Sequence, residues 1–91
     1  MDNYDFTTTR TLRGDPVKMR RSLDQFLFKA GSGIPFLCVF SFPEVVGEVT
    51  THGFRLDRDM EEFELVKDSF LKYVDSFSDD ILKDIVIFVY Y

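Results

Sequence analysis

Residues 57–80 constrain the fold of this chain more than any other segment, because they form an amphipathic pattern with two opposite faces. Apolar side chains recur at spacings of three and four, which places them on one side of an α-helix: Met60, Phe63, Val66, Phe70, Val74 and Phe77. Acidic side chains follow the same spacing on the other side, interrupted mainly by Lys72: Glu61, Glu64, Asp68, Asp75 and Asp79. The pattern predicts a helix over 57–80 that buries its apolar face and exposes its carboxylates.

The composition predicts a single domain over residues 1–91 that folds without a metal or a disulfide. A chain this short builds a small core, but eleven Phe and four Tyr supply large apolar side chains. The one cysteine, Cys38, lies in the apolar run 36–40, where a free thiol packs as a small hydrophobe, as in a reducing compartment. No apolar run approaches the roughly 18 residues of a membrane span, so we expect a cytoplasmic protein with no membrane contact.

The charge differs in sign between the two halves of the chain. Residues 1–43 contain six basic and four acidic residues, whereas residues 44–91 contain five basic and twelve acidic ones, for a total of −5. An excess of acid repels nucleic acid and attracts basic proteins. The second half therefore predicts a basic protein partner and no direct binding of nucleic acid.

The first half of the chain reads as a strand followed by a helix. Residues 4–12 alternate apolar and polar side chains and are rich in Thr, which favours a strand. Asp15 is expected to be the N-cap of a helix that begins at Pro16 and continues to about Ala30. Its buried face comprises Met19, Leu23, Phe26, Leu27 and Ala30, and Gly31 is expected as a left-handed C-cap.

The rest of the chain reads as two strands, the amphipathic helix and a last strand. Residues 34–42 are apolar on both alternating faces, and residues 48–56 follow a turn at 44–47 to complete a hairpin. Asp59 and Glu62 have the spacing of a capping box, and residues 78–80 end the helix or start a short extra turn. The final strand, within 84–91, is again apolar on both faces.

The predicted fold is α+β, a two-layer βαββαβ sandwich in which a four-stranded antiparallel sheet carries two helices on one face, as in ferredoxin-like domains. The ferredoxin-like order places the first and third strands in the centre, whereas here the second and fourth are the most apolar. Either the strand order is 1-4-2-3, or the apolar last strand lies at an edge and pairs with a second copy in a homodimer.

No motif in the sequence predicts a catalytic, cofactor-binding or metal-binding site. His52 is the only histidine and has no neighbouring ligand in sequence, so we interpret it as an ordinary strand residue. Asp57, Asp59 and Glu61 resemble the start of a calcium loop, but Glu62 stands where the loop requires Gly. We therefore predict a non-enzymatic binding protein without cofactors; a small ferredoxin-like enzyme or a ligand- or RNA-binding domain is the alternative.

The acidic residues of the predicted helix and its ends define a candidate partner-binding surface: Asp57, Asp59, Glu61, Glu62, Glu64, Asp68, Asp75, Asp79 and Asp80. Carboxylates four residues apart on a helix lie about 6 Å from each other along its axis, a spacing comparable with that of phosphates on a nucleic-acid strand.

In size, net charge and acid-rich helix the chain resembles the small DNA-mimic inhibitors of phages, of the anti-restriction-nuclease type. The resemblance implies that it binds the DNA site of a nuclease or nucleoid protein in the host cytoplasm. The alternative is a solvated helix face with no partner.

Overall fold

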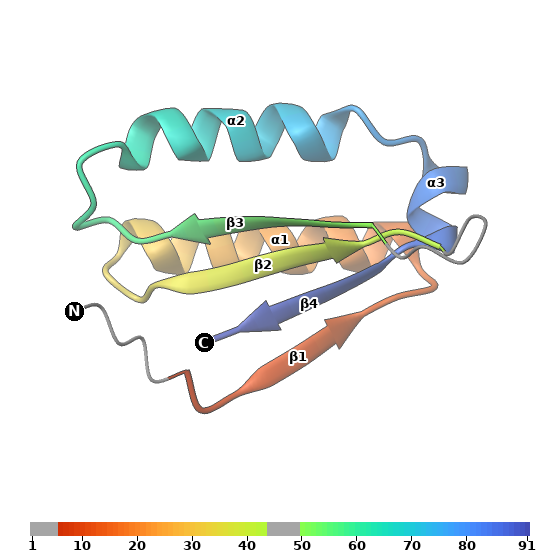
Figure 1. The fold of residues 1–91 in the computed structure, drawn as a ribbon, viewed down its shortest axis with the longest axis horizontal. Helices are drawn as coiled ribbons and strands as arrows, with labels where there is room; N and C mark the ends of the chain where they lie inside the picture. Colours follow the sequence, from red (N-terminus) through yellow and green to blue (C-terminus); the bar gives the residue numbers. More distant parts are fainter. Residues whose placement is uncertain (1–5, 44–49) are drawn as a thin grey trace.

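The computed structural model describes residues 6–43 and 50–91, which form a sheet layer and a helical layer (Figure 1). The elements follow in the order β1 (Thr9–Leu12), α1 (Pro16–Gly31), β2 (Phe36–Ser41), β3 (Thr51–Leu56), α2 (Phe63–Asp75), α3 (Asp79–Asp84) and β4 (Val86–Tyr90). The α+β class and the βαββαβ order of the main elements are confirmed, and α3 adds a short third helix.

The strands form one antiparallel sheet in the order β1-β4-β2-β3, which confirms the 1-4-2-3 arrangement. The alternative with the last strand at an edge is wrong, because β4 pairs with β1 on one side and β2 on the other. The two most apolar strands thus occupy the centre of the sheet, where strands have neighbours on both sides.

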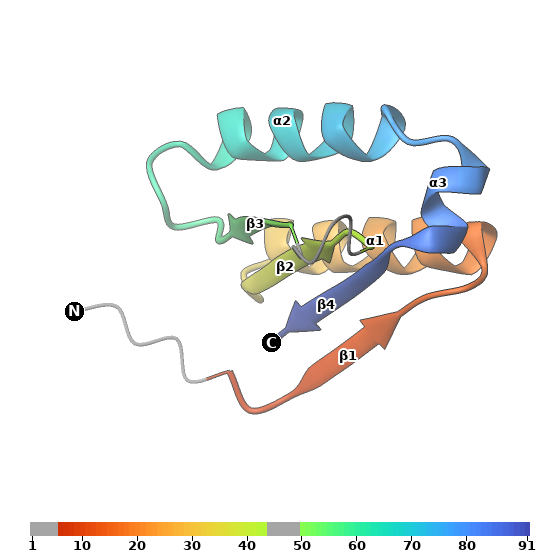
Figure 2. The ribbon, with the colours of Figure 1, turned by 45° about the vertical axis from the view of Figure 1, so that its right-hand side comes forward.

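The helices pack on the same face of the sheet. The ring of Phe36 in β2 lies 5.6 Å from that of Phe26 in α1 and 6.0 Å from that of Phe70 in α2, between centroids. Figure 2 shows α2 above strands β2 and β3 and α1 behind them, with α3 joining α2 to β4. The core lies between these helices and the buried side chains of β2 and β4.

The helix predicted over 57–80 is shorter at both ends. The carboxylate of Asp57 accepts the backbone N–H of Asp59 at 2.9 Å, and its carbonyl accepts that of Met60 at 3.1 Å, so the chain turns before the helix begins. The capping box is wrong, since Glu62 precedes the first helical residue and its side chain caps nothing. The extra turn is confirmed as α3, where the Ser78 hydroxyl accepts the N–H of Ile81.

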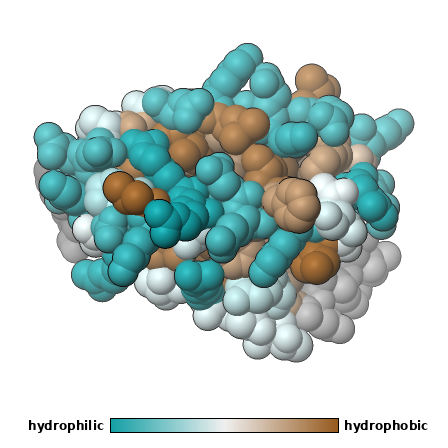
Figure 3. Space-filling model, turned by 180° about the vertical axis from the view of Figure 1, so that it is seen from behind, coloured by the Kyte–Doolittle hydropathy of each residue, from teal (hydrophilic) through white to brown (hydrophobic). Residues whose placement is uncertain are grey.

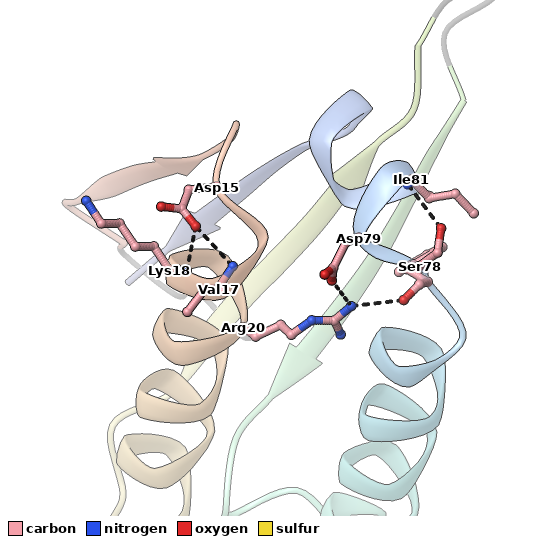
Figure 4. A network of polar contacts seen from close by, with 8 residues as sticks. Asp15, Val17, Lys18, Arg20, Ser78, Asp79 and Ile81 are labelled. Carbon is pink, nitrogen blue, oxygen red and sulfur yellow. Dashed lines mark hydrogen bonds and ion pairs between the residues drawn. The ribbon is translucent and has the colours of Figure 1, made fainter.

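The start of α1 is as predicted and its end is not. The carboxylate of Asp15 accepts the N–H groups of Val17 and Lys18 at 3.1 and 3.2 Å, and Pro16 is the first helical residue (Figure 4). The predicted C-cap at Gly31 is wrong, because the helix includes this residue and the left-handed backbone falls at Gly33, with φ of 103°. The turn into β2 thus comes two residues later than expected.

Within the described residues each strand covers part of its predicted range. The ladder between β2 and β3 pairs residues 36–41 with 51–56, against predicted strands of 34–42 and 48–56. The first strand covers Thr9–Leu12 of the predicted 4–12, and the last covers Val86–Tyr90. Residues 1–5 and 44–49, which hold the predicted turn at 44–47 and two strand beginnings, lie outside the described residues.

Candidate functional site

The orientation of α2 is set by its apolar side chains. Phe63, Phe70 and Val74 are buried, and three further predicted core residues, Met60, Val66 and Phe77, are half-buried against the core. Because the apolar face of α2 packs on the core, the acidic residues of α2 and of the preceding turn remain exposed: Asp59, Glu61, Glu62, Glu64, Asp68 and Asp75. The predicted division of this helix into a buried and an acidic face is therefore correct.

Two lysines reduce the charge of this face. The Nζ atom of Lys72 lies 3.0 Å from the carboxylate of Asp68, and that of Lys67 lies 3.9 Å from the carboxylate of Glu64. Sequence analysis identified Lys72 as the main interruption and missed Lys67. Both pairs are largely exposed, so each contributes a few tenths of a kcal/mol and breaks easily when a stronger partner approaches.

Two of the predicted partner residues make ion pairs within the chain. Arg20 of α1 donates hydrogen bonds to the Asp79 carboxylate and to the Phe77 carbonyl, both at 3.0 Å, and so ties α1 to the start of α3 (Figure 4). The side chain of Asp57 is only 14 % exposed and lies 4.0 Å from Arg55. Asp79 is thus exposed but paired with Arg20, and Asp57 is largely buried, whereas Asp59 and Asp80 are exposed.

Acidic charge is concentrated in one continuous part of the chain. Residues 57–84, which contain α2 and α3, carry ten acidic and four basic residues, whereas the remainder carries six acidic and seven basic ones. By contrast, α1 contains four basic residues and one acidic residue, Asp24. Figure 3 shows the helical side as mainly hydrophilic, with hydrophobic side chains exposed between the polar ones. The two long helices of one layer thus carry opposite charge.

The environment of His52 was predicted only in part from the sequence. His52 is an exposed residue of the edge strand β3, as expected for a strand histidine, and its ring stacks on that of Tyr73 at 4.6 Å. Burial raises the pKa of Tyr73 above its ordinary value. No sequence signal relates these two rings, because the contact arises only when α2 docks beside β3.

Cys38 is fully buried, as predicted, and burial raises the pKa of its thiol far above the ordinary value. The thiolate is the nucleophile and the metal ligand in cysteine chemistry, so this side chain packs as an inert apolar group. Within residues 6–43 and 50–91, no group of three or more His, Cys, Asp or Glu side chains is arranged to hold a metal ion.

A shallow groove of about 400 Å³ runs between β3 and α2. Its lining is mainly apolar, with Arg55 and Ser69 as polar side chains among Gly53, Phe54, Met60, Leu65 and Val66. Leu65 is 72 % exposed at the rim of this groove. Leu65 lies three residues before Asp68 on α2, so the rim of this groove adjoins the acidic face.

Comparison with known proteins finds no matching family model and no curated protein that is similar to this chain. In the part of the chain that the structure describes, no helix is both long enough and apolar enough to span a bilayer.

Proposed function

We propose that this chain is a non-enzymatic binding protein whose acidic face, formed by α2 and the turn before it, binds a basic DNA-binding protein. The observation that carries the proposal is a row of exposed carboxylates, with Glu61 in the turn before α2 and Glu64, Asp68 and Asp75 on the helix itself. The apolar face of the same helix fixes this row in place through Phe70 and Val74. The carboxylates are thus held on a rigid element, as recognition of a regular basic surface requires.

In the specific form of the proposal the acidic face acts as a DNA mimic and inhibits a nuclease or a nucleoid protein. A DNA-binding site presents Lys and Arg side chains to a row of phosphates, and a row of carboxylates on a helix offers it charges of the same sign at comparable spacing. Lys67 and Lys72 leave this row with a lower charge than DNA. Because both lysines are on flexible stems, they turn away when the partner supplies its own cations.

Charge-removing substitutions test this proposal directly. A variant with Glu61→Gln, Glu64→Gln, Asp68→Asn and Asp75→Asn keeps the shape of α2 and removes four charges. The parent protein should displace labelled duplex DNA from purified basic DNA-binding proteins, and the variant should need at least a tenfold higher concentration for the same effect. Displacement by the parent should weaken steeply with salt, since the Debye length is about 10 Å at 0.1 M.

The matched control removes four charges from other parts of the sequence, with Asp2→Asn, Asp5→Asn, Asp24→Asn and Glu48→Gln. It has the same net charge as the test variant and an intact α2, so it should inhibit like the parent. The free energy of unfolding of the test variant should change by less than about 1 kcal/mol, because exposed ion pairs contribute little. Equal displacement by the test variant and the parent would contradict the proposal and identify the acids as a solvated face.

A further inference from the structure

The sheet has a second face, opposite the helices, and its centre is apolar. Because side chains alternate along a strand and Cys38 and Val89 face the core, their neighbours in sequence point away from it. Strand pairing places Leu37 opposite Tyr90 and Val39 opposite Phe88, with Val86 opposite Ser41 at the end. Five apolar side chains on this face are half-buried and are not among those that pack on the core: Leu37, Val39, Val86, Phe88 and Tyr90.

Small and polar side chains surround this apolar patch. On one side β1 contributes Thr9 and Thr11, and on the other β3 contributes Thr51, Gly53 and Arg55. No described helix lies on this side of the sheet, as the views in Figures 1 and 2 both show. An apolar centre with aromatic anchors and a polar rim is the usual anatomy of a protein–protein interface.

The sequence pattern of the two central strands independently indicates that this face is covered. An antiparallel sheet with one solvated face shows alternating apolar and polar residues, whereas β2 and β4 are apolar on both faces. The helices account for only one of these faces. We infer that the second face is the interface of a homodimer, in which two copies pack sheet against sheet.

The charge distribution favours a second copy as the occupant. The chain carries a net charge of −5, so two copies repel each other over most of their surfaces. The strand positions on this face include no acidic residue and one cation, Arg55, which lies 4.0 Å from Asp57 of its own chain. Two copies that meet through these strands therefore bring no acidic strand residue of one copy against an acidic strand residue of the other.

The area of this face is large enough for a weak dimer. The four strands are spaced about 4.8 Å apart, and the three rows of side chains on this face are spaced about 6.8 Å apart along the strands. The face therefore has a projected area of roughly 400 Å² on each copy. Two copies thus bury on the order of 1,000 Å² once side-chain relief is included, which is at the lower limit for specific interfaces. We therefore expect a dissociation constant in the micromolar range and a two-fold axis through the centre of the patch.

Sedimentation velocity tests the dimer, with the protein at about 1 µM to about 500 µM so as to span a micromolar dissociation constant. The parent should change from monomer to dimer with rising concentration. Phe88→Lys should remain monomeric at every concentration, because a two-fold interface would bury two lysines at its centre. Phe28→Lys is the matched control: Phe28 is 77 % exposed on α1, so this variant should dimerise like the parent.

A second variant keeps the test decisive if Phe88→Lys does not fold, as judged by circular dichroism and thermal unfolding. Val39→Thr preserves shape and strand propensity but adds one hydroxyl per copy at the interface, which should raise the dissociation constant by about tenfold. A parent that is monomeric throughout would overturn the inference. So would a dimer whose dissociation constant is unchanged in each variant that folds.

Discussion

Cys38 illustrates how position in the sheet determines the chemistry of a residue. It lies on the core face of β2, where its pairs are Phe54 of β3 and Val89 of β4. Because burial raises the pKa of the thiol, the folded state binds a proton that the unfolded state releases near pH 9. The contribution of this thiol to stability is therefore complete below about pH 9 and is lost as the pH rises above it.

The resulting prediction concerns alkaline stability. Above about pH 9 the thiol alone should reduce the free energy of unfolding by up to about 1.4 kcal/mol per pH unit. Urea unfolding of the parent and of Cys38→Ala between pH 7 and about pH 10.5 measures this contribution. The parent should lose stability faster than the variant above pH 9, while both behave alike below it. Parallel curves over the whole range would mean that the thiol is accessible in the folded protein.

At the scale of elements, α2 is held by aromatic contacts rather than by its charges. The ring of Phe70 is 1 % exposed and lies 5.4 Å from that of Phe54 in β3 and 6.1 Å from that of Phe40 in β2, between centroids. This one side chain therefore joins the helix to two strands. Its contacts position the acidic face, so the docking of α2 and the proposed function depend on the same residue.

Phe70→Ala should accordingly lower the free energy of unfolding by about 3–5 kcal/mol, the range for a fully buried Phe. Denaturant unfolding monitored by circular dichroism measures the change. Phe28→Ala, at a site 77 % exposed on α1, serves as the control and should cost less than about 0.5 kcal/mol. A loss below 1 kcal/mol for Phe70→Ala would show that α2 docks through another face.

At the scale of the whole molecule, the two inferred surfaces lie on different sides. The inferred dimer interface is on the open side of the sheet, and the acidic face is on the helical layer. In a dimer packed sheet against sheet, the two sheets lie about 10 Å apart and both helical layers face outward. Each copy then keeps its acidic face free, so dimerisation leaves the proposed binding surface accessible on both sides.

Because the inferred dimer is weak, its effect should appear as a dependence of thermal stability on concentration. Association of folded copies stabilises them by mass action, so the melting temperature should rise by about 3–5 °C for each tenfold increase in concentration above the dissociation constant. Differential scanning calorimetry at several concentrations measures this rise. Phe88→Lys should show no such dependence, and a parent with the same melting temperature at all concentrations would contradict the dimer.

The fold could be predicted from sequence wherever the signal is a local periodicity. The spacing of Phe63, Phe70 and Val74 was enough to define the buried face of α2, and Asp15 with Pro16 was enough to locate the start of α1. The apolar character of β2 and β4 on both faces left two alternatives, and the one that places both strands in the centre is confirmed by the order β1-β4-β2-β3. Each of these features depends on side chains within one element, so a single strand or helix contains the information.

Features that depend on contacts between distant residues could not be predicted. Two element boundaries also differ from the prediction: α2 starts at Phe63, after a turn at Asp57, and α1 includes Gly31. For the candidate site, the sequence determined which acids share a face of the helix. Only the tertiary structure decided that Asp79 is engaged by Arg20 of α1, and that no helix among residues 6–43 and 50–91 lies against one face of β2 and β4. Periodicity determines which side of an element is apolar, whereas what covers that side depends on packing among elements far apart in the chain.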